Sequence, residues 1–398
     1  MKNKISIPKF VIAAPGHCAY YDSLALALHK HGLLRFVAMG TRRGVDGLPD
    51  EFVRLNPAIG LANYVAAKTL PPFAAESFRE RSFPWFDHWV KKQLTPGDHI
   101  ISSYAYANES FKWVRAHGGK TLLDGGNSHP ENFWNILSEE QRLQHSKHPP
   151  VPGHFHRRSM AMMEHVDYVM PASSYVANSF LARGFKPGSF LAHSRPVNPS
   201  IFKPLETVRP KDRPLTLICT GDLCLRKGTP YLLESFRLVR NKIPDVKFVL
   251  RRSIRDDIKP AFARYQDLPI QWLEYLPQPE LAHQLRQADL FILPSLEEGM
   301  ARTACEAMAC GLPAILTTNT GANDFIRPGV NGEVVPIRDP QAIADAVFKW
   351  AEKILSPGWQ PRVATDWELL TSESLFEQMF IGQLRQLQLA PDKNPSSE

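Results

Sequence analysis

Short apolar runs alternate with segments of helical periodicity in the second half of the chain. The runs have the length of buried strands, and they are Leu215–Cys219, Val246–Leu250, Ile270–Leu273, Asp289–Leu293 and Pro313–Leu316. Apolar positions recur at helical spacing in Thr229–Arg240, Glu280–Gln287, Thr303–Cys310 and Pro340–Ile354. This alternation predicts βαβ units on a parallel sheet whose strands are buried on both faces.

The first half repeats the pattern less regularly. Its predicted strands are Phe10–Ala14, Arg35–Met39, His99–Ser103, Thr121–Leu123 and Tyr168–Pro171, and its predicted helices are Tyr21–His31, Glu109–His117 and Ser174–Arg183. The fold class predicted is therefore α/β, with two Rossmann-like domains facing across a cleft. The carboxyl edges of two parallel sheets are the usual position of a ligand.

Proline and charged residues gather between Pro196 and Pro214, where the apolar pattern changes. We place the domain boundary there, with an N-terminal domain over residues 1–200 and a C-terminal domain over residues 201–375. Residues 391–398 have the composition of a disordered tail.

Composition narrows the class of protein. Of 398 residues 43% are hydrophobic, which is ordinary for a globular chain, and none of its apolar runs reaches the length of a membrane span. Phe10–Ala14 is too short for the apolar region of a secretory signal. The five cysteines are odd in number and form no CxxC pair, which favours a reducing compartment. A cytoplasmic location is expected.

Positive charge is concentrated in the first half. Residues 1–200 carry 23 Lys and Arg against 15 Asp and Glu, whereas the whole chain has a net charge of +7. The excess indicates either a solvated basic surface or an acidic partner.

The stretch from Leu293 to Ile315 carries the strongest chemical signal. A buried strand ends at Pro294, a polar turn holds Glu298 and Gly299, and a helix carries Glu306. Backbone N–H groups at the start of a helix suit phosphate or sugar oxygens, and a glycine lets a ligand approach the backbone. Two carboxylates near one crevice can accept hydrogen bonds from hydroxyl groups. The alternative for Glu306 is a role in helix packing.

This stretch resembles the signature of glycosyltransferase family 4, the retaining nucleotide-sugar transferases of the GT-B fold. The matching positions are Pro294, Ser295, Glu298, Gly299, Glu306, Ala307, Ala309, Gly311 and Pro313, followed by Gly321, Gly329, Asn331 and Gly332. The likeness also covers Gly221 to Phe236 and Asp366 to Glu368. It spans residues 165–375 well and residues 1–164 weakly.

The resemblance implies roles for these positions. It places Glu306 on the ribose hydroxyls of the donor and Glu298 on the transferred sugar. The backbone of the following turn is expected to face the sugar and the diphosphate, and that turn comprises Gly299, Met300, Ala301, Arg302 and Thr303. Residues 376–390 are expected to form a helix that returns to the first domain.

A second matching stretch runs from Thr220 to Gly228. Lys227 and Gly228 agree with the family pattern, in which an arginine and a lysine hold the donor diphosphate. Asp222 stands where the family has that arginine, and a carboxylate would repel a diphosphate. Arg226 or Arg252 is expected to replace it, although a solvent-facing Arg226 is the alternative.

Three further positions enter through the resemblance. Gly16 lies in the loop after the first strand, near the expected donor and acceptor, and Leu276 lies where the family binds the base with its backbone. His129 follows another strand, and the resemblance makes it a sugar-facing residue that acts with Glu298. A loop or core histidine is the alternative. Glu139 and Glu140 are expected on a helix surface.

Several other chemistries find no support. No D-x-D triplet or metal-spaced cluster occurs, so neither metal nor cofactor is expected. G-x-G-x-x-G, P-loop and G-x-S-x-G motifs are missing as well. Phe73 to Leu94 interleaves aromatic and basic residues, which favours either core packing or contact with an anionic membrane surface. No named nucleic-acid motif is present, and no nucleic-acid partner is expected.

The function predicted is hexosyl transfer, with retention, from a nucleotide diphosphate sugar to a glycan, a lipid-linked or a small-molecule acceptor. The family is thought to react on one face of the sugar, with a donor phosphate oxygen helping to deprotonate the acceptor. Two alternatives remain open at this point. One is a silent GT-B scaffold that binds nucleotide sugars, suggested by Asp222 and by Ala301 in place of a family glycine. The other is a nucleotide-sugar epimerase.

Overall fold

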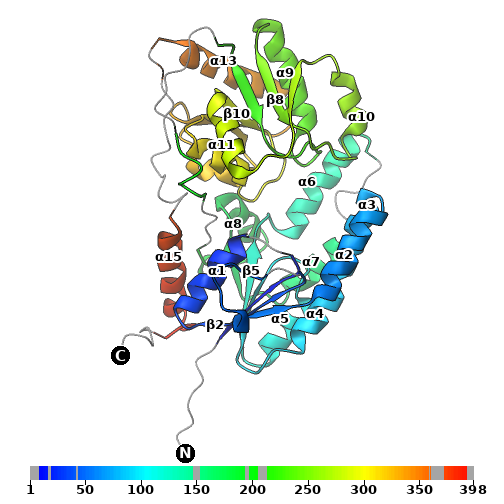
Figure 1. Cartoon of the computed structure of the whole chain (residues 1–398), viewed down its shortest axis with the longest axis vertical. Coiled ribbons are helices and arrows are strands. Elements are labelled where there is room, and N and C mark those ends of the chain that lie inside the picture. The colour runs from blue at the N-terminus through cyan, green and yellow to red at the C-terminus, as the bar shows by residue number, and fades with distance from the viewer. Residues whose placement is uncertain are drawn as a thin grey trace, which may run out of the picture.

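The computed structural model describes residues 9–16, 19–41, 44–146, 153–192, 197–204, 213–357, 359 and 372–391. Two lobes lie one above the other along the long axis of the molecule (Figure 1). Each lobe is built on a six-stranded sheet in which all paired strands are parallel. The α/β class and the two Rossmann-like sheets predicted from the apolar pattern are confirmed.

The N-terminal lobe has the strand order β3-β2-β1-β4-β5-β6. Its strands are β1 (Phe10–Ala14), β2 (Leu34–Met39), β3 (Val53–Leu55), β4 (His99–Ser102), β5 (Thr121–Gly125) and β6 (Tyr168–Pro171). Its helices are α1 (Ala19–Lys30), α2 (Pro57–Thr69), α3 (Pro72–Arg81), α4 (Phe83–Lys91), α5 (Asn108–Ala116), α6 (Pro130–Leu143), α7 (Gly153–Met163) and α8 (Ser174–Leu181). Short 3₁₀ turns cover Asp50–Phe52 and Pro187–Ser189.

The C-terminal lobe has the strand order β12-β11-β10-β7-β8-β9. Its strands are β7 (Thr216–Cys219), β8 (Lys247–Arg251), β9 (Ile270–Leu273), β10 (Leu290–Leu293), β11 (Ala314–Thr317) and β12 (Gly332–Val335). Its helices are α9 (Thr229–Lys242), α10 (Lys259–Phe262), α11 (Gln278–Gln287), α12 (Arg302–Ala309) and α13 (Pro340–Leu355), with 3₁₀ turns at Ala263–Tyr265 and Gly321–Phe325.

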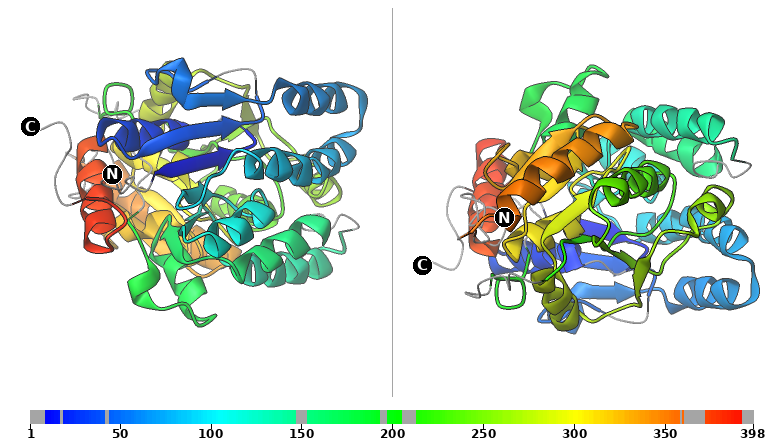
Figure 2. Two further views of the ribbon diagram at one scale, coloured as in Figure 1. Left: turned by 90° about the horizontal axis from the view of Figure 1, so that it is seen from below. Right: turned by 90° about the horizontal axis from the view of Figure 1, so that it is seen from above.

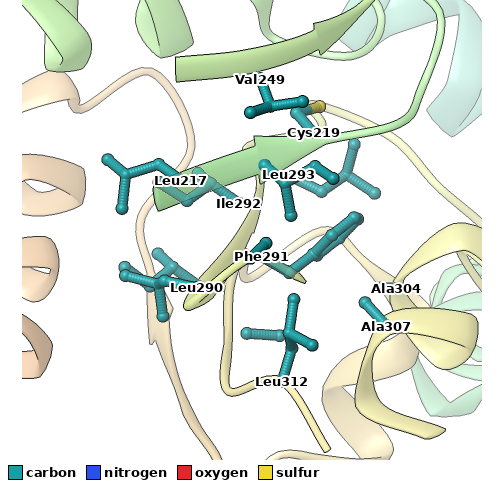
Figure 3. Packing of buried hydrophobic residues seen from close by; sticks show 14 of the residues in the cluster. Leu217, Cys219, Val249, Leu290, Phe291, Ile292, Leu293, Ala304, Ala307 and Leu312 are labelled. Atoms are coloured by element: carbon teal, nitrogen blue, oxygen red, sulfur yellow. The ribbon is translucent and has the colours of Figure 1, made fainter. Parts of the chain in front are cut away.

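The core of the C-terminal lobe fixes the position of α12. Strands β7 and β10 are central in the sheet, and all four residues of each strand are buried. Phe291 on β10 packs in one cluster with Ala304 and Ala307 of α12 (Figure 3). These small alanines let the helix approach the sheet closely, because close-packed interiors leave little free volume. The end of β10 and the start of α12 are therefore held firmly.

The final helix belongs to the core of the first lobe. Helix α15 (Glu373–Gln386) lies beside α1, with Phe376 and Phe380 buried in the N-terminal cluster (Figure 1). Glu377 accepts hydrogen bonds from Lys30 at 3.2 Å and from His31 at 2.8 Å. The chain thus crosses between the lobes a second time. Most of the tail predicted to be disordered lies outside the described residues.

The aromatic segment from Phe73 to Leu94 forms α3 and α4. Phe83 and Phe86 are buried in the lobe, and Trp89 packs against the same core as Phe86. Trp85 is 61% exposed. Core packing therefore accounts for much of this segment. Within the described part of the chain, no helix is both long enough and apolar enough to cross a membrane.

Candidate active site

Two loops that leave neighbouring central strands come into contact at one edge of the C-terminal sheet. Strands β7 and β10 are paired and parallel, so the loops after Cys219 and Leu293 start at the same edge. Leu296 N donates to Arg226 O at 2.9 Å. Gly228 has a φ of 66°, and a Cβ there would lie 1.9 Å from the carbonyl oxygen of Pro294. The two loops therefore pack backbone to backbone, and position 228 requires glycine.

Two cations and one carboxylate meet at this contact. The Arg226 guanidinium donates to Glu298 Oε2 at 2.8 Å, and the Lys227 ammonium also pairs with that oxygen. Burial alone would raise the pKa of Glu298, but Lys227 and Arg226 outweigh it and hold the pKa at about 2. All three predicted residues thus lie together, and Arg226 is not solvent-facing.

Glu306 lies on the first turns of α12 with one charged partner. Arg302 Nε donates to Glu306 Oε1 at 3.1 Å, and the Glu306 side chain is 7% exposed while that of Arg302 is 47% exposed. Burial raises the pKa of Glu306, and Arg302 opposes that rise. Ala301 caps this helix with a φ of 63°, a left-handed conformation that favours glycine. The family pattern has glycine at this position, so the geometry survives the substitution.

Three hydroxyl groups point to a polar ligand at the same edge. Within the described chain, the buried hydroxyl oxygens of Thr220, Ser295 and Thr303 form no hydrogen bond. Thr220 follows β7, Ser295 follows β10, and Thr303 lies in the first turn of α12. Buried polar groups normally have partners, so these hydroxyls are available to a polar ligand at this edge of the sheet.

The other predicted donor residues lie farther out on the sheet. Arg252 is 56% exposed and pairs with Glu274 at 3.1 Å, and Leu276 is half-buried after edge strand β9.

Asp222, the departure from the family pattern, lies 3.7 Å from Arg251 and 3.8 Å from Arg255. Its charge is therefore compensated locally. Arg226 already touches the Lys227–Glu298 pair, whereas Arg252 is held by another carboxylate.

His129 occupies a structural position in the N-terminal lobe. Its Nδ1 accepts from Glu131 N at 3.3 Å, which caps α6, and its ring packs against Phe180 and Phe185. Burial, assisted by Arg183, lowers the pKa of His129 to about 4. The neutral ring thus caps α6 and packs against apolar side chains. A contact of His129 with a sugar stays a prediction. Gly16 follows β1 at an exposed point with open space around its Cα.

Glu297, which the sequence analysis did not single out, joins the lobes. It is 0% exposed, and it accepts from Ser128 N at 2.9 Å and from Asn127 Nδ2 at 3.0 Å. Next to it, a Cβ on Gly299 would lie 1.9 Å from the carbonyl oxygen of Gly126. Spacing rules could not find Glu297, because its partners are 169 and 170 residues away.

The expectation for Glu140 was wrong. This residue is fully buried between the lobes, where Arg338 Nε donates to it at 2.8 Å and the Tyr231 hydroxyl at 3.0 Å. Glu139 is 51% exposed, as expected, and also pairs with Arg338. The helical period of apolar residues identifies the helix face that packs within its own lobe. It gives no signal for a polar face that the other lobe covers.

A cavity of about 270 Å³ opens beside these contacts. Asn127 and Ser128 line it from the first lobe and Arg226 from the second. The rest of its wall is mainly aromatic and basic, and includes Arg79, Phe83, Tyr104, Tyr106, Phe133, Phe155 and His156. His129 is not among the lining residues. The described residues contain no group of three or more His, Cys, Asp or Glu side chains that could hold a metal ion.

Comparison with known proteins finds a family match in the C-terminal lobe. The family described as Glycosyl transferases group 1 matches residues 214–353, which include both loops, Lys227, Glu298 and Glu306. A relative from Mycolicibacterium smegmatis, a GDP-mannose-dependent alpha-(1-6)-phosphatidylinositol monomannoside mannosyltransferase, is 27% identical over 201 residues, which is 46% of this chain and 52% of the relative. The chain spans half or less of the length of the first curated relatives that it matches.

Solved structures extend the likeness to both lobes. Sucrose-phosphate synthase from Thermosynechococcus elongatus has a TM-score of 0.64 and 21% identity, covering 96% of this chain and 98% of that one. Anabaena HepE in complex with UDP has a TM-score of 0.57 and 14% identity, with 96% and 98% covered. The GT-B architecture predicted for both lobes is thereby confirmed.

Proposed function

We propose that this chain, whose residues 214–353 match the group 1 glycosyl transferases, moves a hexosyl group from a nucleotide diphosphate sugar to an acceptor with retention at the anomeric carbon. The observation that carries the proposal is the meeting of Arg226 and Lys227 with Glu298 at the edge formed by β7 and β10, with Glu306 on the helix that follows the second loop. A diphosphate needs paired cations, and a ribose needs a hydroxyl acceptor. The two loops that touch hold the cations, and helix α12, which follows the loop after β10, holds Glu306.

Glu298 has a second role in this proposal. Its carboxylate now neutralises Arg226 and Lys227, the same cations that a diphosphate would need. Donor binding would therefore exchange one anion for another on these cations and release Glu298 toward the transferred sugar. The unpartnered hydroxyls of Ser295 and Thr303 and the backbone from Gly299 to Thr303 would take up further donor oxygens. Cationic side chains and the start of α12 supply the charge stabilisation, so no metal is required.

The cavity between the lobes is the proposed acceptor site. Its volume suits a single sugar ring, and aromatic side chains such as Tyr104, Phe83 and Phe155 can pack against the apolar faces of a ring. Arg226 lines the cavity and also belongs to the donor loops, so an acceptor there would lie beside the reacting group. Holding both substrates in place accounts for much of the rate in such transfers.

A lipid-linked acceptor would bring the N-terminal lobe to a membrane. Helix α2 contains no acidic residue and exposes Leu61, Tyr64 and Val65 on one face, at 45%, 62% and 48%. It lies at the periphery of the lobe in both views of Figure 2. We propose peripheral contact with anionic lipid at the cytoplasmic face. In flotation with vesicles that contain anionic lipid, less of the L61S/V65S variant than of wild type should float with the vesicles. Equal binding of the variant and wild type would exclude this face of α2 as the contact.

Two steps test the function. A thermal-shift screen against UDP, GDP, ADP and their sugars identifies the donor, because a ligand that binds only the folded state raises the melting temperature. Product analysis with that donor then follows, with and without a panel of glycan and lipid-linked acceptors. Transfer with retention supports the proposal. Nucleotide binding without any turnover supports the scaffold alternative, and conversion of the donor without acceptor supports the epimerase.

A further inference from the structure

Glu297 forms a contact that links the two lobes. It comes from the loop after β10, yet both of its oxygens accept hydrogen bonds from the N-terminal lobe. Oε1 accepts from the Ser128 amide at 2.9 Å, and Oε2 accepts from the Asn127 side chain at 3.0 Å. The carboxylate is 0% exposed. A buried carboxylate is costly unless it is hydrogen-bonded. Both donors to Glu297 come from the other lobe, so its hydrogen bonds depend on closure of the lobes.

The same carboxylate is adjacent to the donor cations. Arg226 Nη1 lies 3.7 Å from Glu297 Oε2, and it also donates to Glu297 O at 2.9 Å and to Glu298 Oε2 at 2.8 Å. One guanidinium therefore faces both the interlobe carboxylate and the predicted donor carboxylate. An anion that replaces Glu298 as the partner of Arg226 would therefore bind next to the contact between the lobes.

Close backbone packing surrounds Glu297. Gly299 has no room for a Cβ because of Gly126 O, and Ser173 Oγ donates to Gly299 O at 2.6 Å. Met300 packs against the hydrophobic clusters of both lobes. The loop of Asn127 and Ser128 also lines the cavity proposed for the acceptor. A displacement of that loop would therefore move a wall of the cavity relative to the donor loops.

We propose that Glu297 is a positioning residue that clamps the Asn127–Ser128 loop to the donor loops, so that the acceptor cavity is in register with the donor only when the lobes are closed. This inference rests on the proposed function for its kinetic consequence. Its structural part, the clamp itself, is independent of that function. Glu297 acts through Asn127 and Ser128 and is not required to touch a substrate.

The test compares E297A and E297Q with wild type and with E109Q, a matched control on the exposed face of α5 with a side chain that is 59% exposed. Transfer by E297A should fall roughly 10- to 100-fold in kcat, the scale expected for a small misplacement of reacting groups. Its Kd for the nucleoside diphosphate found in the screen should stay within about threefold, because Lys227, Arg226 and Glu306 remain. The E297Q amide oxygen can still accept from Ser128 N, so it should restore most of kcat.

Hydrogen exchange and small-angle scattering report on the clamp without any turnover. The Ser128 amide of E297A should exchange faster than in wild type, and the radius of gyration should increase, with E109Q unchanged. If wild type shows no transfer, the proposed function fails while these two measurements still decide the clamp. Should E297A fold poorly, N127A removes one donor from the opposite lobe and should give the same changes on a smaller scale. Unchanged exchange and kcat in E297A, or a loss of nucleotide binding equal to the loss of kcat, would overturn the proposal.

Discussion

Arg338 and Glu140 form an ion pair between the two lobes, with Nε 2.8 Å from Oε2. The carboxylate is fully buried and the guanidinium is 20% exposed. The backbone of Arg338 has a φ of 63°, which few residues other than glycine adopt. Tertiary contacts therefore hold this arginine in place, and Glu140 depends on it.

Replacement of Arg338 should show how much this pair contributes. R338A leaves a buried carboxylate with Tyr231 as its main donor, and we expect a loss of about 3–5 kcal/mol in the free energy of unfolding. Urea denaturation of R338A and wild type measures this difference in the free energy of unfolding. E140Q combined with R338A should recover part of the loss, because the uncompensated charge is gone. If the double variant is as unstable as the sum of the single variants, the two side chains are not coupled.

Glu306→Ala tests the proposed ribose contact. Hydrogen bonds to a charged group contribute about 1.5–3 kcal/mol, so the Kd for the nucleoside diphosphate should rise roughly 10- to 100-fold. Calorimetry gives the Kd, and E352A, an exposed position on α13, is the matched control.

Glu306→Gln separates binding from folding. Because burial raises the pKa of Glu306, its ionised form does not favour the folded state, and this variant should keep or raise the melting temperature without ligand. Wild-type nucleotide affinity in E306A would contradict the assigned role.

Lys227→Ala tests the proposed diphosphate site. We expect weaker binding of the nucleoside diphosphate, by about tenfold or more, and little change for the nucleoside alone, since the lost bond is a charge-assisted one to phosphate. K247A removes an exposed lysine at the start of β8 and serves as the control. An equal loss for nucleoside and diphosphate would place Lys227 outside the phosphate site.

His129 should make stability depend on pH. The unfolded chain takes up a proton on this histidine near pH 6.5, whereas the folded chain does so near 4. The free energy of unfolding therefore falls as the pH drops from 6.5 to 4, by up to about 3 kcal/mol for this one group. His99 has the same shift, to about 4, so H129N should reduce the slope without abolishing it.

Urea denaturation at several pH values between 4 and 7 measures the slope, with H117N, on the exposed end of α5, as the control. Asparagine keeps the cap on α6. Turnover of H129N at pH 7.5 therefore tests the predicted sugar contact separately. Full activity would leave His129 as a cap alone.

The apolar pattern was sufficient for most of the strands. Runs such as Phe10–Ala14 and Ile270–Leu273 were predicted with their observed bounds, because strands buried on both faces leave a continuous apolar signal. Strands β3 and β12 were missed, as were helices α2, α3, α4, α6, α7 and α10. Strand β3 has three residues and α2 carries apolar side chains on its exposed face, so neither has the usual pattern.

The sequence by itself determined the fold class and the resemblance to a glycosyltransferase family, because buried strands and the loop from Pro294 to Glu306 depend on local order along the chain. Only the tertiary structure decided which charges face one another. Glu297 lies against Asn127 and Glu140 against Arg338 because two separately built lobes meet there. Periodicity records burial within one sheet or helix, and it carries no information about a partner that lies about 170 or 200 residues away.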